Sequence, residues 1–370
     1  MTAGLFEPSQ TPGLFAPLSL GGLTLPNRIA VSPMCQYSAE DGRATDWHLV
    51  HLGGLAQGGA GLVLTEAAAV CPEGRISPQD LGLWRDDQVE PLARAVRFIR
   101  AQGAVAGIQL AHAGRKAGVE APWRGGGVIP QDQGGWAGLA PSALPFDAGW
   151  PQPRVLDEDG LTQVKAQFRA AALRALAAGF QVVEVHGAHG YLLHQFLSPL
   201  SNRREDAYGG SFLNRTRLLR EVVATVREVW PEPLPVLVRI SATDWVEGGW
   251  DPDQSVALAE ALKPLGVALV DCSSGGNVAK ASIPVGPGYQ VPFAARIRRE
   301  TGMATGAVGL ITGAAQAQAI VAEGSADLVL LGRELLREPR WPLRAAAELG
   351  IEVPWPAQYA RAAAGRVPVR

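Results

Sequence analysis

The segment from Pro235 to Ser274 reads PVLVRISATDWVEGGWDPDQSVALAEALKPLGVALVDCSS, and it contains the structural unit that recurs along the chain. Its two ends, PVLVRIS (235–241) and VALVDCSS (267–274), are short apolar runs without polar alternation. Such runs are typical of strands that are buried on both faces of a parallel sheet. The stretch 253–263 between them is amphipathic and favours a helix. Strand, helix and strand in this order predict a βαβ unit.

The same alternation recurs along the whole chain. The other strand candidates are RIAVSPM (28–34), AGLVLTEA (60–67), AVAGIQL (104–110), QVVEVHG (181–187), ATGAVG (304–309) and ADLVLLGR (326–333). The other helical stretches lie around 46–57, 87–102, 158–178, 213–229, 291–301, 313–323 and 334–348. Eight strand–helix units predict a closed (β/α)8 TIM barrel, formed as a single domain by residues 1–370.

An open doubly wound sheet is the alternative to the barrel. Such a sheet normally carries a glycine-rich phosphate fingerprint at its first strand–helix turn. Here the first turn reads SPMCQYSAEDG (32–42) and has no G-x-G-x-x-G. The glycine cluster GGLAQGGAG (53–61) precedes a strand, so we interpret it as a helix end and a turn.

Three segments lie outside the barrel pattern. We expect residues 1–27 to form a short cap over the bottom of the barrel. Residues 119–153 are rich in Gly, Pro and Trp and lack a helical period. A connection of this length is typical of a functional lid or binding loop. Residues 350–370 form a tail that is rich in Pro and Arg.

Composition limits the class of protein. The 370 residues are 47% hydrophobic and carry a net charge of −2, which gives no indication of a nucleic-acid or membrane partner. Three distant cysteines, Cys35, Cys71 and Cys272, exclude a disulfide framework and a four-cysteine metal or iron–sulfur site. Because we find neither a signal peptide nor an apolar run of membrane-spanning length, we expect a soluble cytoplasmic enzyme.

Barrel enzymes take their catalytic groups from the C-terminal ends of the strands. Reading those ends in chain order gives Pro33, Cys35, Tyr37, Glu66, Ala67, Gln109, His112, Arg115, Lys116, His186, His189, Tyr191, Arg239, Gly309, Gly332 and Arg333. These residues form the inventory from which a site is expected.

Two histidines and a tyrosine stand together in EVHGAHGY (184–191). A metal pair would want a third ligand, but we expect Glu184 on the opposite face of the strand. A purely structural role for both histidines is a second alternative. In the third interpretation, which we favour, His186 and His189 donate hydrogen bonds to one oxyanion, as neutral imidazoles do. Tyr191 then serves as a neutral acid, because its ordinary pKa is near 10.

The other strand ends also have two interpretations each. Arg239 either forms an ion pair with a barrel carboxylate such as Asp271 or faces a cofactor that becomes anionic on reduction. Gly309, and the Gly–Arg pair at 332–333, suit a phosphate held by backbone N–H groups, although a single glycine also fits a plain turn. Cys35 fits a small buried apolar position, but its place at a strand mouth favours a site role.

Together these residues resemble the old yellow enzyme family of flavin-dependent ene-reductases. The matching segments are SPMCQYSAEDG (32–42), EAAAVCPEGRIS (66–77), GIQLAHAGRK (107–116), EVHGAHGYLLHQFLSPLSNRREDAYGGSFLNR (184–215), ATGAVG (304–309) and LGRELLREP (331–339). The likeness runs from about Leu14 to Arg361. Cys35 followed by Tyr37 resembles the thermophilic-like branch, whereas the Trp-rich segment 119–153 resembles bacterial xenobiotic reductases.

The resemblance implies a barrel that holds FMN at its top. By this resemblance FMN is bound by Ser32, Pro33, Met34, Cys35, Ala67, Gln109, Arg239, Gly309, Gly332 and Arg333. Gln109 is expected at the pyrimidine ring and Arg239 near flavin N1, with the last three residues at the phosphate. Cys35 is expected beside the isoalloxazine, where it tunes the flavin potential. His186 and His189, helped by Tyr37, are expected to bind the substrate carbonyl, and Tyr191 to donate the proton.

The implied reaction is ping-pong. NAD(P)H, with a lean to NADPH over NADH, reduces FMN and leaves, and an α,β-unsaturated carbonyl compound then takes hydride at its β-carbon and a proton from Tyr191 at its α-carbon. Composition alone favours a solvated basic tail, but the resemblance implies a homodimer or homotetramer in which Arg361 of the QY-x-R segment completes the neighbour's substrate pocket. The alternatives are a dienoyl-CoA-type reductase without its Fe–S domain, a metal-dependent barrel hydrolase or lyase, and a non-catalytic binding protein.

Overall fold

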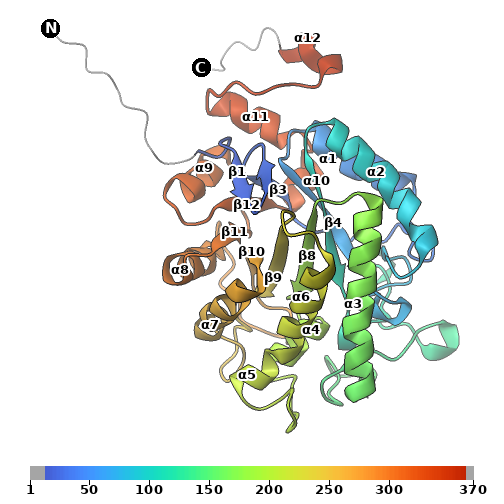
Figure 1. The fold of residues 1–370 in the computed structure, drawn as a ribbon. Coiled ribbons are helices and arrows are strands. Elements are labelled where there is room, and N and C mark those ends of the chain that lie inside the picture. Colours follow the sequence, from blue (N-terminus) through green and yellow to red (C-terminus); the bar gives the residue numbers. More distant parts are fainter. Residues whose placement is uncertain (1–12, 364–370) are drawn as a thin grey trace.

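The computed structural model describes residues 13–363, and its centre is a closed barrel of eight parallel strands ringed by helices (Figure 1). The strands are β3 (Ile29–Val31), β4 (Leu62–Ala69), β5 (Val105–Ala111), β8 (Val182–Gly187), β9 (Val236–Ser241), β10 (Val267–Ser273), β11 (Ala304–Ala307) and β12 (Leu328–Leu331). Each strand pairs with the next along the chain, and β12 closes the ring on β3 through the pair Val329 and Ile29. The predicted (β/α)8 barrel and all eight predicted strands are confirmed.

The helices form a layer around the barrel, except for the last one, which lies in the tail at the closed end (Figure 1). They are α1 (Asp46–Gln57), α2 (Val89–Ala101), α3 (Glu158–Ala178), α4 (Leu192–Leu197), α5 (Phe212–Arg215), α6 (Arg217–Val229), α7 (Pro252–Leu262), α8 (Val291–Thr301), α9 (Ala314–Ala322), α10 (Arg333–Arg337), α11 (Trp341–Glu348) and α12 (Ala360–Ala363). Two stretches predicted as single helices are broken, at Thr216 and at 338–340. Pro339 and Pro342 explain the second break, because proline has no N–H to continue a helix. Gly58 ends α1 as the glycine cluster predicted.

The bottom of the barrel is sealed by a hairpin. Strands β1 (Leu18–Leu20) and β2 (Leu23–Leu25) are antiparallel, and their leucines share one apolar cluster with the lower barrel leucines. This cluster includes Leu62, Leu237 and Leu269, which point into the barrel from different strands. The predicted cap is therefore confirmed for residues 13–27, whereas residues 1–12 lie outside the described part of the chain. The hairpin therefore closes the interior of the barrel at this end, whereas the predicted site residues lie at the opposite end.

The segment 119–153 contains no long helix, as predicted, but it is fixed to the barrel. The guanidinium of Arg75 lies between the rings of Trp84 and Trp136, 5.4 and 5.0 Å from their centroids. The indole Nε1 of Trp136 also donates to the backbone oxygen of Glu73 at 2.9 Å. Later in the segment, strand β6 (Leu139–Ala140) pairs with β7 (Arg154–Val155).

A smaller loop within this segment closes on itself. Val119 and Val128 form an antiparallel bridge, and the N–H of Glu120 donates to the oxygen of Gly127 at 2.8 Å. At the tip, Trp123 is 66% exposed. Its ring meets that of Tyr37 edge-on, with 5.5 Å between centroids.

The tail crosses the capped end of the barrel as the short turn η7 (Ala357–Tyr359) followed by α12 (Figure 1). The guanidinium of Arg340 lies 4.5 Å from the ring centroid of Tyr359, and Arg361 is exposed to solvent. The last part of the predicted tail, residues 364–370, lies outside the described chain. Between residues 13 and 363 no helix combines the length and the apolar character that crossing a bilayer demands.

Candidate active site

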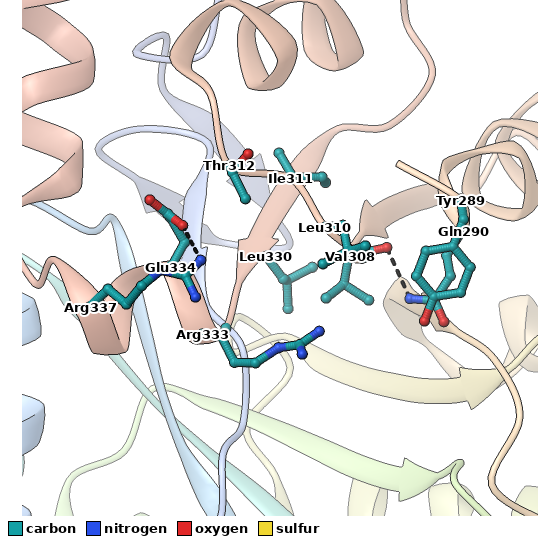
Figure 2. Close-up of a pocket in the computed structure, with 12 residues that line it drawn as sticks. Tyr289, Gln290, Val308, Leu310, Ile311, Thr312, Leu330, Arg333, Glu334 and Arg337 are labelled. Atoms are coloured by element: carbon teal, nitrogen blue, oxygen red, sulfur yellow. Dashed lines mark hydrogen bonds and ion pairs between the residues drawn. The ribbon is translucent and has the colours of Figure 1, made fainter. Parts of the chain in front are cut away.

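A cavity of about 210 Å³ opens at the C-terminal ends of β11 and β12 (Figure 2). Three of its lining residues, Gly309, Gly332 and Arg333, were predicted to hold a phosphate. The other lining residues are Tyr289, Gln290, Val308, Leu310, Ile311, Thr312, Leu330, Glu334 and Arg337. Figure 2 shows Arg337 turned to Glu334, with which it forms an ion pair. No carboxylate pairs with Arg333 in the described part of the chain, so its charge is left for a ligand.

The wall of this cavity requires glycine at one position. Gly309 has φ of +120°, a backbone conformation that residues with a Cβ rarely adopt. In addition, a Cβ at this position would lie 2.8 Å from Nε2 of Gln290. That amide is held in place by donating to the oxygen of Val308 at 3.0 Å. A cavity with exposed loop backbone and one unpaired guanidinium fits a phosphate group.

The residues predicted around the flavin ring gather on the neighbouring strands. Ala67 and Gln109 are register partners on β4 and β5, and Ser32 follows β3 directly. Gly332 faces Met34, because a Cβ on Gly332 would lie 3.5 Å from its sulfur. The phosphate-type cavity and the segment after β3 are therefore contiguous. This is one face at the barrel top, as the inventory of strand ends predicted.

A buried charged group lies inside the barrel below this face. Nε of Arg239 is 3.0 Å from Oδ2 of Asp271, so the ion pair considered from the sequence is present. Gln109 donates from Nε2 to Oε1 of Glu184 at 2.8 Å. Burial, and then the charge of Asp271, raise the pKa of Glu184 above its usual value.

The expected orientation of Glu184 was wrong. Glu184 contacts Gln109 inside the barrel and is fully buried, so it lies on the same face of β8 as His186. The reason is the period of a strand, in which residues two apart point to the same side. Even so, no three His, Cys, Asp or Glu side chains gather as metal ligands between residues 13 and 363.

His186, His189 and Tyr191 meet at the mouth of the barrel. The two imidazole centroids are 5.2 Å apart, and the Tyr191 ring lies 5.1 Å from that of His186. Nε2 of His189 is 2.7 Å from the hydroxyl of Ser273, whereas Nδ1 of His186 is buried without a partner. The structure therefore brings the three residues predicted from EVHGAHGY into one cluster.

Burial sets the protonation of this cluster. Burial, followed by the nearby charge of Arg239, lowers the pKa of both His186 and His189 well below the usual value. Burial raises the pKa of Tyr191 well above its usual value, and it does the same for the Cys35 thiol. At neutral pH the imidazoles are therefore neutral, and Tyr191 keeps its proton.

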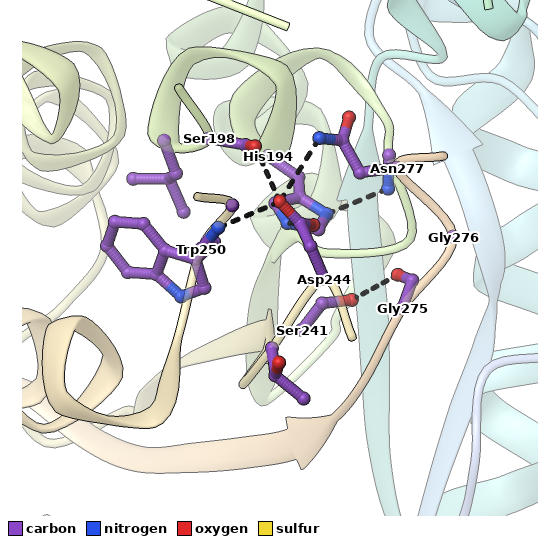
Figure 3. Close-up of polar contacts among 12 residues, drawn as sticks. His194, Ser198, Ser241, Asp244, Trp250, Gly275, Gly276 and Asn277 are labelled. Carbon is purple, nitrogen blue, oxygen red and sulfur yellow. Dashed lines mark hydrogen bonds and ion pairs between the residues drawn. The ribbon is translucent and has the colours of Figure 1, made fainter. Parts of the chain in front are cut away.

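A polar network holds the turn that carries these residues (Figure 3). The N–H of Gly190 donates to Nδ1 of His194 at 2.9 Å, so Nε2 of His194 carries the proton and points to Oδ1 of Asp244 at 3.1 Å. Asp244 also accepts from Ser198 at 2.5 Å and from the N–H of Trp250 at 2.9 Å. Burial alone would raise the pKa of Asp244, but these partners, His194 first, bring it down to about 2.

Sequence reasoning missed this network. Its members come from α4 and from the segment after β9, and the N–H of His189 adds a further bond to Ser241 at 2.9 Å. His189 has φ of +57°, an uncommon conformation for a residue with a side chain. The one signal in the sequence was a third histidine, His194, within nine residues of the other two.

Comparison with known proteins agrees with this geometry. The model of the NADH:flavin oxidoreductase / NADH oxidase family matches residues 13–352. An NADPH dehydrogenase of Halalkalibacterium halodurans is 48% identical over 351 residues, which make up 94% of this chain and 98% of that protein. The structure of morphinone reductase superposes with a TM-score of 0.77 at 30% identity, covering 93% of this chain and 91% of that one. An old yellow enzyme homologue from Zymomonas mobilis gives a TM-score of 0.75 at 27% identity, over 92% and 94% of the two chains.

Proposed function

Because the chain belongs to the NADH:flavin oxidoreductase / NADH oxidase family, we propose that it is an ene-reductase acting on α,β-unsaturated carbonyl compounds. Family membership makes it an FMN-dependent oxidoreductase that takes its electrons from NAD(P)H. When bound, FMN supplies the hydride chemistry, taking hydride from the nicotinamide and giving it to the second substrate. The observation that carries the proposal is the cluster of two neutral imidazoles and a protonated tyrosine at the barrel mouth.

The strand ends suit the two parts of FMN. Gly309, Gly332 and Arg333 would hold its phosphate, since they line a cavity that has an unpaired cation. Residues of the first three barrel strands and their ends would contact the ring, namely Ser32, Pro33, Met34, Cys35, Ala67 and Gln109. Arg239 would face the ring from within the barrel while it stays paired with Asp271. With its thiol protonated, Cys35 would tune the flavin without acting as a nucleophile.

The histidine pair would bind and polarise the substrate. A carbonyl oxygen that accepts hydrogen bonds from His186 and His189 gains negative charge during hydride addition, which neutral N–H donors stabilise. Tyr37, whose pKa is raised by burial, would help to bind the same oxygen. Tyr191 would then donate the proton of its hydroxyl to the α-carbon. Burial keeps that proton on Tyr191 until a carbanion is there to take it.

The tail would take part through assembly. We propose that the chain forms a homodimer or homotetramer in which Arg361 reaches the substrate pocket of a neighbour. The support is that Arg361 is exposed on α12, and that Tyr359 beside it is held by Arg340. An arginine suits this task because it stays charged and can stack and hydrogen-bond at once. We also propose that the enzyme is cytoplasmic. In that compartment its three free cysteines would stay reduced.

The test of the proposed function is a pair of half-reactions on the FMN-loaded protein. Anaerobic mixing with NADPH, and separately with NADH, should bleach the flavin absorbance, and 2-cyclohexenone should then restore it. Gas chromatography should identify cyclohexanone as the product. A flavin that NADPH reduces but that no enone reoxidises would leave the protein an NAD(P)H oxidoreductase and refute the ene-reductase assignment.

A further inference from the structure

Lys116 contacts the turn between β8 and α4 (residues 188–191), called the catalytic turn below because it carries His189 and the proposed proton donor Tyr191. It ends the short turn η3 (Gly114–Lys116) that follows β5. Its ammonium donates to the backbone oxygens of His189 and Gly276, both at 2.9 Å. The same nitrogen lies 5.1 Å from the ring centroid of Tyr191 and 4.6 Å from that of Phe146. One cation therefore links the turn after β8, the loop after β10 and the segment 119–153.

This cation has no acidic partner. No ion pair joins Lys116 to a carboxylate in the described chain, and the charged group facing it from its own turn is Arg115, another cation. From the catalytic turn it faces Tyr191 and His189, and the remaining contacts, Phe146 and the oxygen of Gly276, bring no titratable group. Burial, and then Arg115, lower the pKa of Lys116 to about 8. Within the described chain, Lys116 is therefore a largely buried cation that contacts backbone oxygens and aromatic rings in place of a carboxylate.

Lys116 donates to the backbone oxygens of His189 and Gly276 at a place where the backbone of His189 has an uncommon conformation. His189 is in the left-handed region, and its Cα would lie 2.7 Å from a Cβ on Gly276, so the two backbones touch there. A residue in this conformation keeps it only when its surroundings over-determine it. The Lys116 bond to the His189 oxygen, together with the Ser241 bond to the His189 N–H, holds the two peptide groups that flank this residue.

Resting on the function proposed above, we propose that Lys116 is a positioning residue that holds His189 and Tyr191 in their reactive arrangement and balances the charge on Tyr191. When the Tyr191 hydroxyl gives its proton to the α-carbon, its oxygen is left as a phenolate, which solvent later reprotonates. A cation 5.1 Å from the centroid of that ring would lower the cost of the phenolate. The same charge helps to keep His186 and His189 neutral.

The experiment compares K116M and K116R with the parent, all as FMN holoenzymes, with K165M on the outer helix α3 as a matched lysine control. Flavin reduction by NADPH and reoxidation by 2-cyclohexenone are followed separately from pH 6 to pH 10. K116M, which keeps the stem but lacks the charge, should slow reoxidation on the order of tenfold to hundredfold, less than a full general-acid contribution. Reduction by NADPH should change little in every variant.

The pH profile separates charge from packing. In the parent, reoxidation should fall as pH rises through about 8, because Lys116 loses its proton there. K116R should lose this alkaline decline, since guanidinium stays charged throughout the range. A second readout is the charge-transfer band of bound 4-hydroxybenzaldehyde, which should need severalfold more ligand in K116M than in K165M.

The outcomes distinguish the two proposals. If the parent is not reoxidised by the enone, the proposed function fails, whatever the variants do. If the parent is reoxidised and K116M matches it in rate and in ligand binding, the role of Lys116 is overturned. If K116M does not fold, as judged by its thermal midpoint, K116R decides alone, and an alkaline decline like that of the parent refutes the proposal.

Discussion

The side chains of His186, His189 and Tyr191 owe their protonation states to burial at the barrel mouth. In water an imidazole is partly charged near pH 6.5, whereas here the desolvation of both rings holds them neutral. Two neutral donors and one neutral acid are suited to stabilise and protonate a developing enolate. The chemistry at this scale therefore depends on the surroundings of the three residues as much as on their identity.

Tyr191→Phe should separate the two half-reactions. Reduction by NADPH should be nearly unchanged, because it needs no proton donor. Reoxidation by 2-cyclohexenone should slow by roughly 10²–10⁴-fold, the usual range for loss of a general acid. Stopped-flow absorbance of the flavin measures both steps, and equal losses in the two would contradict the role of Tyr191.

Replacement of both His186 and His189 by Ala should abolish tight binding of phenols over the flavin. Removal of an oxyanion donor typically costs about 3 kcal/mol, so enone reduction should fall steeply as well. The charge-transfer band on titration with 4-hydroxybenzaldehyde measures the binding, and His51→Ala, on α1, is the matched control. A double variant that binds the phenol like the control would disprove the assignment.

Which residues gather at the ends of the strands could be predicted from the sequence, but how they contact one another could not. The polar residues that follow each apolar strand can be read directly from the sequence. His186, His189 and Tyr191 were found in this way. Glu184 was misplaced by a slip in strand period. Asp244 could not be found at all, because it meets His194 only when the segment after β9 folds against α4.

At the scale of the elements, the turn between β8 and α4 depends on supports from other parts of the barrel. Asp244 follows β9, and through His194 it fixes the N–H of Gly190. The acid form of Asp244 could not accept all of its bonds, which is why its pKa is low. Strand ends in this barrel thus hold each other in place.

Asp244→Asn tests this dependence through pH. The folded pKa of about 2 lies below the ordinary 3.8, so the charge of Asp244 stabilises the fold above about pH 4, and this stability is lost as pH falls through 2. The shift corresponds to about 2 kcal/mol at neutral pH, from about 1.4 kcal/mol per pKa unit. Urea unfolding at several pH values should give a flatter acid slope for Asp244→Asn than for the exposed control Asp253→Asn. Identical slopes would contradict the argument.

Most helices and strands could be predicted, because the spacing of their apolar residues and the length of each apolar run distinguish the two. Helix α3 and strand β9 lie within a residue of their predicted bounds. The helix break at Thr216 could not be seen, because the apolar pattern continues across it from α5 to α6. Helix α4 is six residues long, too short for a period to appear.

In the molecule as a whole, the β1–β2 hairpin closes one end of the barrel, and the candidate site lies at the other. The buried residues of the candidate site, such as His186, all come from one copy of the chain. The tail lies at the closed end of its own barrel, so its proposed use must come through a second copy of the chain. The alternation of strands and helices in the sequence predicts the barrel. It does not show where two copies of the chain would contact each other.

Truncation before Trp355, and Arg361→Ala within the full chain, test this assembly. Both should raise KM for enones, because a charged group that binds the substrate is lost, and the truncation should also weaken the dimer. Light scattering at micromolar concentration measures the assembly, with Arg299→Ala as a surface control. A monomeric parent, or a truncated form with unchanged kinetics, would rule the proposal out.

The loop of residues 120–127, which the Val119–Val128 bridge closes, is a part of the enzyme whose sequence could change without disturbing the barrel. Its ends are fixed to each other and its tip, Trp123, reaches Tyr37, so its length and tip can vary while the strands stay as they are. We therefore expect substitutions in this loop to change which substrates bind while the residues proposed to react with them stay in place. A library confined to residues 120–127 would explore new substrates in a chain that still folds and still loads its cofactor.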